Sequence, residues 1–231
     1  MKRFYKECGI GTAEGGFSVT LDGRPVQTPA RVVLALPTAP LAEAIAEEWR
    51  VQGETVVPDT MPLMRLATTA VDRVTAEREA VTGDLVSFGG GDLLCYRAES
   101  PAELVERQSA GWQPLIDWVA AHHDAALAVT SGLVAIEQPA PSLAVFRRVL
   151  EGLDAFELMV VQTVTASTGS LVVALALYAG QLDGTQAFEA GALDDLYGLE
   201  IWGEDKDARE RLDGLCANIL AAERMLQLLR A

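Results

Sequence analysis

The chain has 231 residues, of which half are hydrophobic, and a formal net charge of −15 at pH 7. Affinity for phosphate backbones comes from lysine and arginine, so 33 acidic against 18 basic residues argue against DNA, RNA and anionic membrane surfaces as partners. The same charge would attract a basic face on a partner protein, or it serves solubility alone.

The first 36 residues are predicted to form a small β meander. Apolar and polar residues alternate over residues 17–21, a turn is expected at Asp22-Gly23, and apolar residues resume over 32–36. A further short strand is expected at residues 3–8.

From Thr38 the pattern becomes helical. Leu41, Ile45 and Trp49 recur at four-residue intervals, which is typical of an amphipathic helix. Trp49 lies on the apolar stripe, and we interpret it as a structural anchor in the core. One or two further helices are expected after Pro62, ending at the glycines of 89–91.

The remainder is predicted to be almost entirely helical. A capping box at Ser100-Pro-Ala-Glu103 predicts a helix start, and Pro114 predicts a kink or break in that helix. The apolar run 171–179 predicts a buried helix that is too short to cross a bilayer, so no membrane insertion is expected. Glycine and serine at 169 and 170 are predicted to end one helix and cap the next.

The expected fold class is therefore α+β, with a small β-rich N-terminal domain followed by a larger all-helical C-terminal domain. We place the boundary between residues 73 and 74, so that residues 1–73 also hold one or two helices and residues 74–231 form the helical domain. A regular apolar stripe from Leu212 to Leu229 predicts the last helix.

The sequence lacks the usual patterns of metal and catalytic sites. His122 and His123 are neighbours in a predicted helix, so their side chains diverge by roughly 100° and do not share a metal readily. Cys8, Cys95 and Cys216 form no Cys-x-x-Cys pair, which argues against zinc and favours a reducing compartment. No serine lies in a Gly-x-Ser-x-Gly pattern and no phosphate loop is present, so no catalytic residue, metal or cofactor is predicted.

Two short segments combine charge with aromatic surface, and we interpret them as partner-binding candidates. The first contains Asp92, Tyr96 and Arg97, followed by Arg107 and Gln108. Grouped charges and aromatics of this kind are common in protein interfaces.

The second segment, residues 193–205, surrounds Trp202 with carboxylates that include Asp194, Glu200 and Glu204. As a structural element, Trp202-Gly203 would close one helix and the following acids would favour the positive end of the next. As a functional element, a carboxylate such as Glu200 would bind an arginine or a free amide of a partner. The residues alone leave both roles open.

Several motifs occur together and in order along the chain. They are Lys2-Arg-Phe-Tyr-Lys6, Leu21-Asp-Gly-Arg-Pro-Val26, Thr28-Pro29, Glu48-Trp49, Met61-Pro-Leu63, Arg65-Leu-Ala67, Asp72, Asp92-Leu-Leu-Cys-Tyr-Arg97, Arg107-Gln108, Thr168-Gly-Ser-Leu171 and Trp202-Gly-Glu-Asp205. With these motifs the chain resembles the assembly chaperone family that holds the alpha subunit of the catalytic sector of F-type ATP synthase. It departs from the residues usual in that family at Met64, Thr68 and Gly198.

The resemblance implies a β-rich domain followed by a helical one, no enzymatic activity and no cofactor. It implies that the chain covers alpha-subunit surface until assembly, and that an acidic residue before the Trp-Gly pair matters, here Glu200 or Asp194. The lack of a long targeting presequence favours a bacterial cytoplasmic form, with a processed form in the mitochondrial matrix as the alternative. The competing hypothesis is a small-molecule enzyme, or a ligand-sensing interaction domain, that uses Arg97 and the carboxylates near Trp202.

Overall fold

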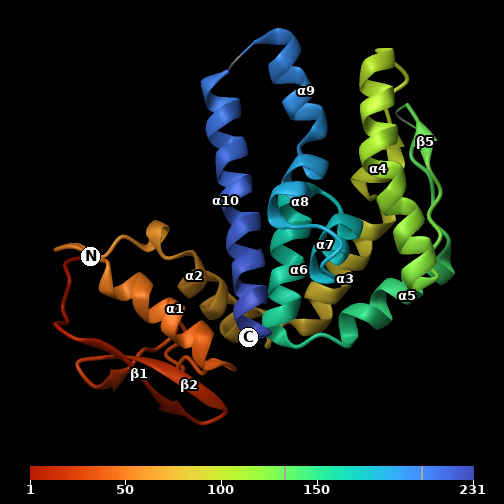
Figure 1. Cartoon of the computed structure of the whole chain (residues 1–231). Helices are drawn as coiled ribbons and strands as arrows, with labels where there is room; N and C mark the ends of the chain where they lie inside the picture. The colour runs from red at the N-terminus through yellow and green to blue at the C-terminus, as the bar shows by residue number, and fades with distance from the viewer. Residues whose placement is uncertain (133, 204) are drawn as a thin grey trace. The chain divides into compact units, whose positions relative to one another are not determined.

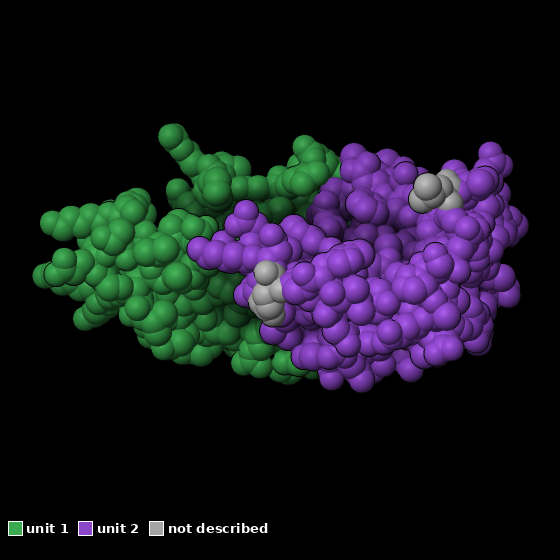
Figure 2. Space-filling view, turned by 90° about the horizontal axis from the view of Figure 1, so that it is seen from above, with its two compact units in different colours: residues 1–78, 155–160, 224–231 green, residues 79–154, 161–223 purple. Residues whose placement is uncertain are grey.

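The computed structural model describes residues 1–132, 134–203 and 205–231. A small antiparallel sheet near the N-terminus is followed by a mostly helical chain (Figure 1), which is the predicted α+β class. The described residues form two compact units, coloured separately in Figure 2. Unit 1 comprises residues 1–78, 155–160 and 224–231, and unit 2 comprises residues 79–154 and 161–223. The domain boundary between residues 73 and 74 stays a prediction.

The sheet of unit 1 has the strand order β1 (Cys8–Ala13), β2 (Gly16–Leu21) and β3 (Arg24–Pro25). Neighbouring strands are antiparallel, with Cys8 opposite Leu21. The predicted turn between β2 and β3 is confirmed: Asp22 and Gly23 have φ angles of 48° and 77°, and such turns favour Asp-Gly because both central residues need positive φ.

Two strand predictions in this region were wrong. The strand expected at residues 3–8 begins instead at Cys8, where Gly9 and Gly11 had hidden the alternation. Residues 32–36 form isolated bridges, Gln27 with Val33 and Phe17 with Leu36, rather than a strand. Bridges of this kind depend on tertiary pairing, which a local pattern does not report.

Helix α1 (Ala39–Arg50) covers the sheet of unit 1. Thr38 caps it by accepting a hydrogen bond from the amide of Leu41 at 3.3 Å. The predicted stripe is confirmed as the core face, with Leu41 and Ile45 fully buried and Trp49 only 7% exposed. Trp49 is therefore buried on the core face of α1, as its spacing predicted.

After α1 come four short helical segments, of which the first three belong to unit 1 and the fourth lies almost wholly in unit 2. These are the 3-10 helix η1 (Pro58–Thr60), α2 (Pro62–Thr69), the π-helical segment η2 (Ala70–Val74) and α3 (Arg78–Gly90).

The elements that follow α3 are a short parallel strand pair and a series of helices. They are η3 (Leu93–Cys95), β4 (Tyr96–Arg97), α4 (Ala102–His123), β5 (Thr130–Ser131), α5 (Ala140–Glu151), α6 (Ala155–Thr168), α7 (Leu171–Tyr178), α8 (Gly184–Gly191), α9 (Leu193–Trp202) and α10 (Lys206–Leu229). Within unit 2, α4, α7, α8 and α9 pack on one another.

Helix α4 differs from its prediction at two points. Its N-cap is Pro101, which has no side-chain cap. The capping box predicted at Ser100 is therefore wrong, although the helix begins within two residues of it. The helix also runs unbroken through Pro114. Pro114 and Ala110 lie on the exposed face, so the Ala110 carbonyl that loses its amide donor remains open to water.

The predicted helix junction at residues 168–170 is confirmed. Gly169 adopts a φ of 72°, and the Ser170 hydroxyl accepts a hydrogen bond from the amide of Val173 at 3.0 Å. Every residue of α7 from Leu171 to Leu177 is buried. Among the described residues, no helix combines the length and the apolar character that a bilayer crossing needs.

Candidate partner-binding surface

Asp92 lies at the centre of unit 2 and not on its surface. One carboxylate oxygen accepts hydrogen bonds from the amide of Leu94 at 3.1 Å and the hydroxyl of Ser170 at 2.7 Å. The other accepts from the amide of Val172 at 3.0 Å. Burial raises the pKa of Asp92 to about 6, although the hydrogen bonds act in the opposite direction and lower this pKa. Because Asp92 has no exposed surface, its interpretation as a partner contact is corrected: it joins η3 to the start of α7.

Arg97 is turned inward. Its guanidinium donates to the carbonyls of Leu94 at 2.7 Å and Gln108 at 3.1 Å, and it lies 5.4 Å from the centre of the Trp112 ring. Burial lowers the Arg97 pKa. Cys95 is fully buried beside it, and burial raises the pKa of that thiol to about 12, so the thiolate form that reacts is suppressed.

Gln108 is also internal, with 1% of its surface exposed. Its side-chain oxygen accepts from the amide of Ala98 at 2.7 Å, and its nitrogen donates to Asp194 at 2.8 Å. The prediction of Gln108 as a direct contact is corrected for the same reason as that of Asp92. It connects the segment after β4 to the start of α9.

Arg107 and Glu200 lie on the surface and are bonded to each other. Arg107 donates to both carboxylate oxygens of Glu200, at 2.5 and 3.0 Å, and to Glu103 at 2.7 Å. Its guanidinium also lies 5.2 Å from the centre of the Tyr197 ring. The hydrogen bonds from Arg107 lower the Glu200 pKa, so this carboxylate is ionised at neutral pH.

Trp202 is the most exposed large apolar side chain on α9. It is 85% exposed, and its neighbour Ile201 is 51% exposed. The ring lies over Gly198, because a Cβ built on that glycine would be 3.1 Å from the Trp202 ring. Trp202 and Gly203 close the helix, with Gly203 at a φ of 92°, which is the structural one of the two roles that the sequence left open. Because tryptophan is enriched at protein interfaces, the exposed Trp202 is a candidate contact residue.

The remaining candidates divide as follows. Tyr96 is half-buried in β4, where it pairs with Thr130. Asp194 is exposed next to Gln108. Glu204 lies outside the described residues, whereas Asp205 caps α10 by accepting from the amide of Ala208 at 2.8 Å.

We call the surface residues of this region the α9 face. It consists of Glu103, Arg107, Glu200, Ile201 and Trp202. Its charged groups are bonded to one another on the surface, while Arg97 points inward. The enzyme hypothesis requires Arg97 and the carboxylates near Trp202 to converge in one pocket. Instead Glu200 is bonded to Arg107 on the surface, while Arg97 donates inward to the carbonyls of Leu94 and Gln108.

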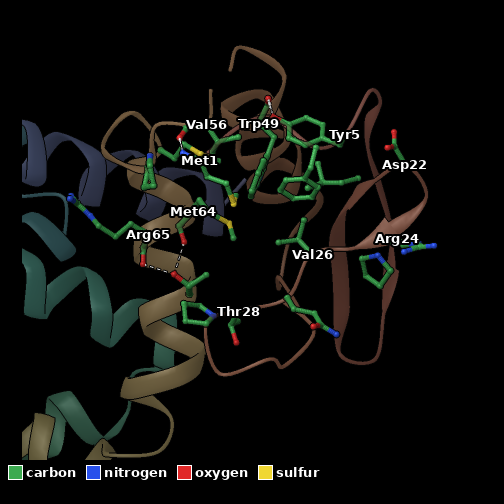
Figure 3. Close-up of a pocket in the computed structure, with 18 of the residues that line it drawn as sticks. Met1, Tyr5, Asp22, Arg24, Val26, Thr28, Trp49, Val56, Met64 and Arg65 are labelled. Carbon is green, nitrogen blue, oxygen red and sulfur yellow. Dashed lines mark hydrogen bonds between the residues drawn. The ribbon is translucent and has the colours of Figure 1, made fainter. Parts of the chain in front are cut away.

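Unit 1 contains a pocket that the sequence did not reveal (Figure 3). Its volume is about 1140 Å³ and its lining is mostly apolar, with methionines at 1, 61 and 64 and aromatic rings at 4, 5 and 49. The alternation in the β meander indicated a core face, but it did not indicate that part of this face stays uncovered. The only sequence signal was the concentration of methionine around Pro62, because methionine is common on adaptable binding surfaces.

One wall of this pocket is fixed by a half-buried acid. Glu48 on α1 accepts hydrogen bonds from the amides of Leu63 and Met64, both at 2.8 Å, at the start of α2. Burial raises the Glu48 pKa. Near the C-terminal end of α1, the Tyr5 hydroxyl donates to the Trp49 carbonyl at 2.6 Å. These bonds hold the two sides of the pocket to the same helix.

The fold and these surfaces define a binding protein, with an exposed aromatic face on one unit and an apolar pocket on the other. The family of ATP12 chaperone proteins matches residues 2–120. The chain belongs to this family, whose members are chaperones and not enzymes.

Relatives and solved structures agree with this assignment. The chain is 26% identical to mitochondrial protein atp12 of Schizosaccharomyces pombe over 97% of its own length and 81% of the relative. It is 38% identical to Atp12 from Paracoccus denitrificans, with a TM-score of 0.94 over 99% of this chain and 98% of that one. It is 37% identical to Atu1473, a putative chaperone from Agrobacterium tumefaciens, with a TM-score of 0.92 over 99% and 86%.

Proposed function

We propose that the chain is an assembly chaperone of F-type ATP synthase, which binds the unassembled alpha subunit and masks its aggregation-prone interface. Membership of the ATP12 chaperone family supports a chaperone role, and the motifs shared with that family support this client. It would act in the bacterial cytoplasm, or in the mitochondrial matrix for a processed eukaryotic form. The beta subunit would release the client by competing for the same interface.

The observation that carries the proposal is the exposed pair Ile201 and Trp202 at the C-terminal end of α9. A rigid aromatic anchor loses little conformational entropy on binding, and such residues dominate the energy of protein interfaces. Covering apolar client surface contributes roughly 25 cal/mol per Å² before the cost of association. Glu200 next to this pair would select a basic or amide-bearing client group.

The direct test uses purified alpha subunit diluted from denaturant, with aggregation followed by light scattering. Wild-type protein should suppress the scattering, and the double variant Ile201→Ser, Trp202→Ser should lose most of that effect. Phe88→Ser is the matched control, because Phe88 is 42% exposed on α3 of the same unit. Full protection by the double variant would reject the α9 face as the contact. No protection by the wild type, together with no capture of alpha subunit, would reject the proposed function.

A further inference from the structure

Strand β1 forms one edge of the unit 1 sheet, because the strand order is β1, β2, β3. Within the described part of the chain, β1 pairs with β2 alone and takes part in no isolated bridge. Ile10 is 43% exposed and Thr12 is also exposed, so the strand reaches solvent along this part. An open edge presents backbone donors and acceptors with which another extended chain can pair.

The pairing register shows which backbone groups of β1 point outward. The Asp22 amide donates to the Glu7 carbonyl at 3.0 Å, so these two residues form a hydrogen-bonded pair. In an antiparallel ladder such pairs alternate with pairs whose amides and carbonyls point away from the partner strand. The other side of β2 agrees with this count, since the Val19 carbonyl accepts from the amide of Val26 at 2.8 Å. The residues of β1 that face outward are therefore Cys8, Ile10 and Thr12.

One end of this outer edge is already closed. The Cys8 carbonyl accepts a hydrogen bond from Nε of Arg50 at 3.3 Å. The outward amides and carbonyls of Ile10 and Thr12 have no such partner among the described residues. We call these four backbone groups the β1 edge. Only an extended polypeptide supplies donors and acceptors in the alternation that would satisfy all four.

The charge around the β1 edge differs between its two ends. Residues 8–21, which form β1, β2 and their turn, contain a single charged residue, Glu14, and it forms no ion pair with any described residue. An extended segment with a basic residue at the Glu14 end therefore complements the edge. At the closed end three bases and three acids balance one another, namely Arg3, Lys6 and Arg50 with Glu7, Glu43 and Glu47.

These charges disfavour a second copy of this chain as the occupant. Each copy has a net charge of −15, and like-charged chains repel each other. Each copy would also bring an unpaired Glu14 to the contact. A different polypeptide with a basic residue next to an uncharged extended segment avoids both penalties.

We propose that the β1 edge binds an extended segment of a client polypeptide, uncharged at its centre and basic at its end, which adds to the sheet as a further strand. Main-chain hydrogen bonds supply the affinity in this mode of recognition. Gly-rich strands specify register weakly, and β1 has glycine at 9 and 11, so the edge accepts segments of different sequence. The client class rests on the proposed function, whereas the chemistry of the edge does not depend on it.

The direct test follows amide hydrogen exchange in β1 by NMR. The probe is a synthetic peptide with alternating valine and threonine over its five central residues and two lysines at each end. In the free protein the amides of Ile10 and Thr12 should exchange faster than those of Gly9 and Gly11, which face β2. The peptide should slow exchange at Ile10 and Thr12 by about fivefold when roughly 80% of the protein is bound, because only the free fraction exchanges. Binding that leaves both amides unchanged, or no binding at millimolar peptide, would overturn the proposal.

Two modified peptides separate backbone pairing from other contacts. A copy that is N-methylated at its five central residues keeps every side chain but donates no hydrogen bond from either edge. It should bind at least about tenfold more weakly. A copy with glutamates in place of the lysines should bind about fivefold more weakly, because it meets Glu14 with a like charge. Equal affinity of the parent peptide and either copy would contradict the proposal.

Protein variants complete the design. Thr12→Pro removes an outward donor and leaves the ladder with β2 in place, so it should weaken the lysine peptide by about tenfold with little change in melting. Thr12→Val keeps the amide and should bind as wild type does. Glu14→Lys should weaken the lysine peptide by about fivefold, while Glu210→Lys, an equal change of charge at an exposed position in unit 2, should leave it unchanged. Undiminished binding by Thr12→Pro would reject the edge, and if this variant folds poorly the exchange pattern of the wild type decides.

Two further outcomes have distinct meanings. Slow exchange at Ile10 and Thr12 without peptide, increasing with protein concentration together with a dimer in sedimentation, would identify a second copy as the occupant and overturn the proposal. Peptide binding with no protection of alpha subunit by the wild type would reject the proposed function and leave the edge proposal standing. Peptide binding that is absent while alpha subunit is still protected overturns only the edge proposal.

Discussion

Arg107 of α4 and Glu200 of α9, which are 93 residues apart, are joined by two hydrogen bonds of 2.5 and 3.0 Å. This ion pair places a carboxylate next to the exposed Ile201 and Trp202. It is also on the surface, where ion pairs contribute little to stability. The pair therefore suits a positioning and recognition role better than a role in holding the fold.

Replacing Glu200 with lysine should separate these roles. The introduced ammonium group would face the guanidinium of Arg107 and repel it, and the end of α9 would lose its carboxylate. Alpha-subunit binding should therefore fall by about tenfold or more. The melting temperature should change by less than about 3 °C, because the pair is exposed. Surface plasmon resonance and calorimetry measure the two effects.

Glu210→Lys is the matched control, because Glu210 is also an exposed acid paired with a basic residue, Lys206 at 3.5 Å on α10. It should leave binding intact. Equal loss of binding in both variants would show a general effect of charge, and a large loss of stability in Glu200→Lys would assign Glu200 to structure.

Asp92→Asn should destabilise the fold by about 1–3 kcal/mol, since an amide cannot accept from both the Ser170 and Val172 donors. Asp92 has a pKa of about 6 when folded, above its usual 3.8. The folded wild type therefore takes up a proton at higher pH than the unfolded chain, and its stability relative to Asp92→Asn should rise as the pH falls from 7.5 to 5. Urea denaturation at both pH values measures this difference.

Asp84→Asn on the exposed side of α3 is the control for the pH series. Its stability relative to wild type should change little between the same two pH values. A wild-type advantage over Asp92→Asn that shrinks on acidification would contradict the assigned direction of the Asp92 pKa.

The two tryptophans should respond oppositely to the same substitution. Trp49→Arg should cost at least about 3 kcal/mol, because it removes a buried ring and desolvates a charge. Trp202→Arg should leave the melting temperature nearly unchanged, since that ring is 85% exposed, while alpha-subunit binding is lost. A fully stable Trp49→Arg protein in thermal denaturation would show that the pocket wall tolerates a charge.

Gly198→Ala should displace the Trp202 ring and at the same time stabilise α9. The new Cβ would lie 3.1 Å from the Trp202 ring, so the ring must move, while the helix gains about 0.5–1 kcal/mol. Gly214→Ala in α10, where no atom lies within 4 Å of the added Cβ, should bring the gain alone. Fluorine NMR of 5-fluorotryptophan protein should show a shifted Trp202 signal only in Gly198→Ala. Identical spectra for the two variants would mean that the ring does not rest on Gly198.

Local periodicity predicted the parts of the fold that depend on local physics. The α1 stripe, the buried run of α7 and the Gly169-Ser170 junction follow from burial at helical spacing and from capping, both of which are properties of adjacent residues. The strand at Cys8–Ala13 was missed because glycines contribute no side chain to an alternating pattern. Pro114 was predicted to cause a kink or a break, and the break was wrong, because the proline lies on the exposed face, where the freed carbonyl of Ala110 meets water.

The candidate site was predicted in composition but not in arrangement. Asp92, Arg97 and Gln108 have the same polar character as Glu200, yet the first two satisfy backbone groups inside unit 2 and Gln108 links two of its segments. Sequence does not distinguish a buried polar group with partners from an exposed one. The unit 1 pocket was missed for a related reason, since an apolar residue that lines a cavity has the same pattern as one that fills a core.

By itself the sequence determined the α+β class, the binding character of the chain and the family to which its motifs point, because composition, periodicity and motif order are properties of the chain alone. The tertiary structure decided which charges face solvent, that Trp202 is exposed, and where an apolar wall stays open. Those properties depend on solvent access and on contacts between residues far apart in sequence, which exist only after the chain has folded.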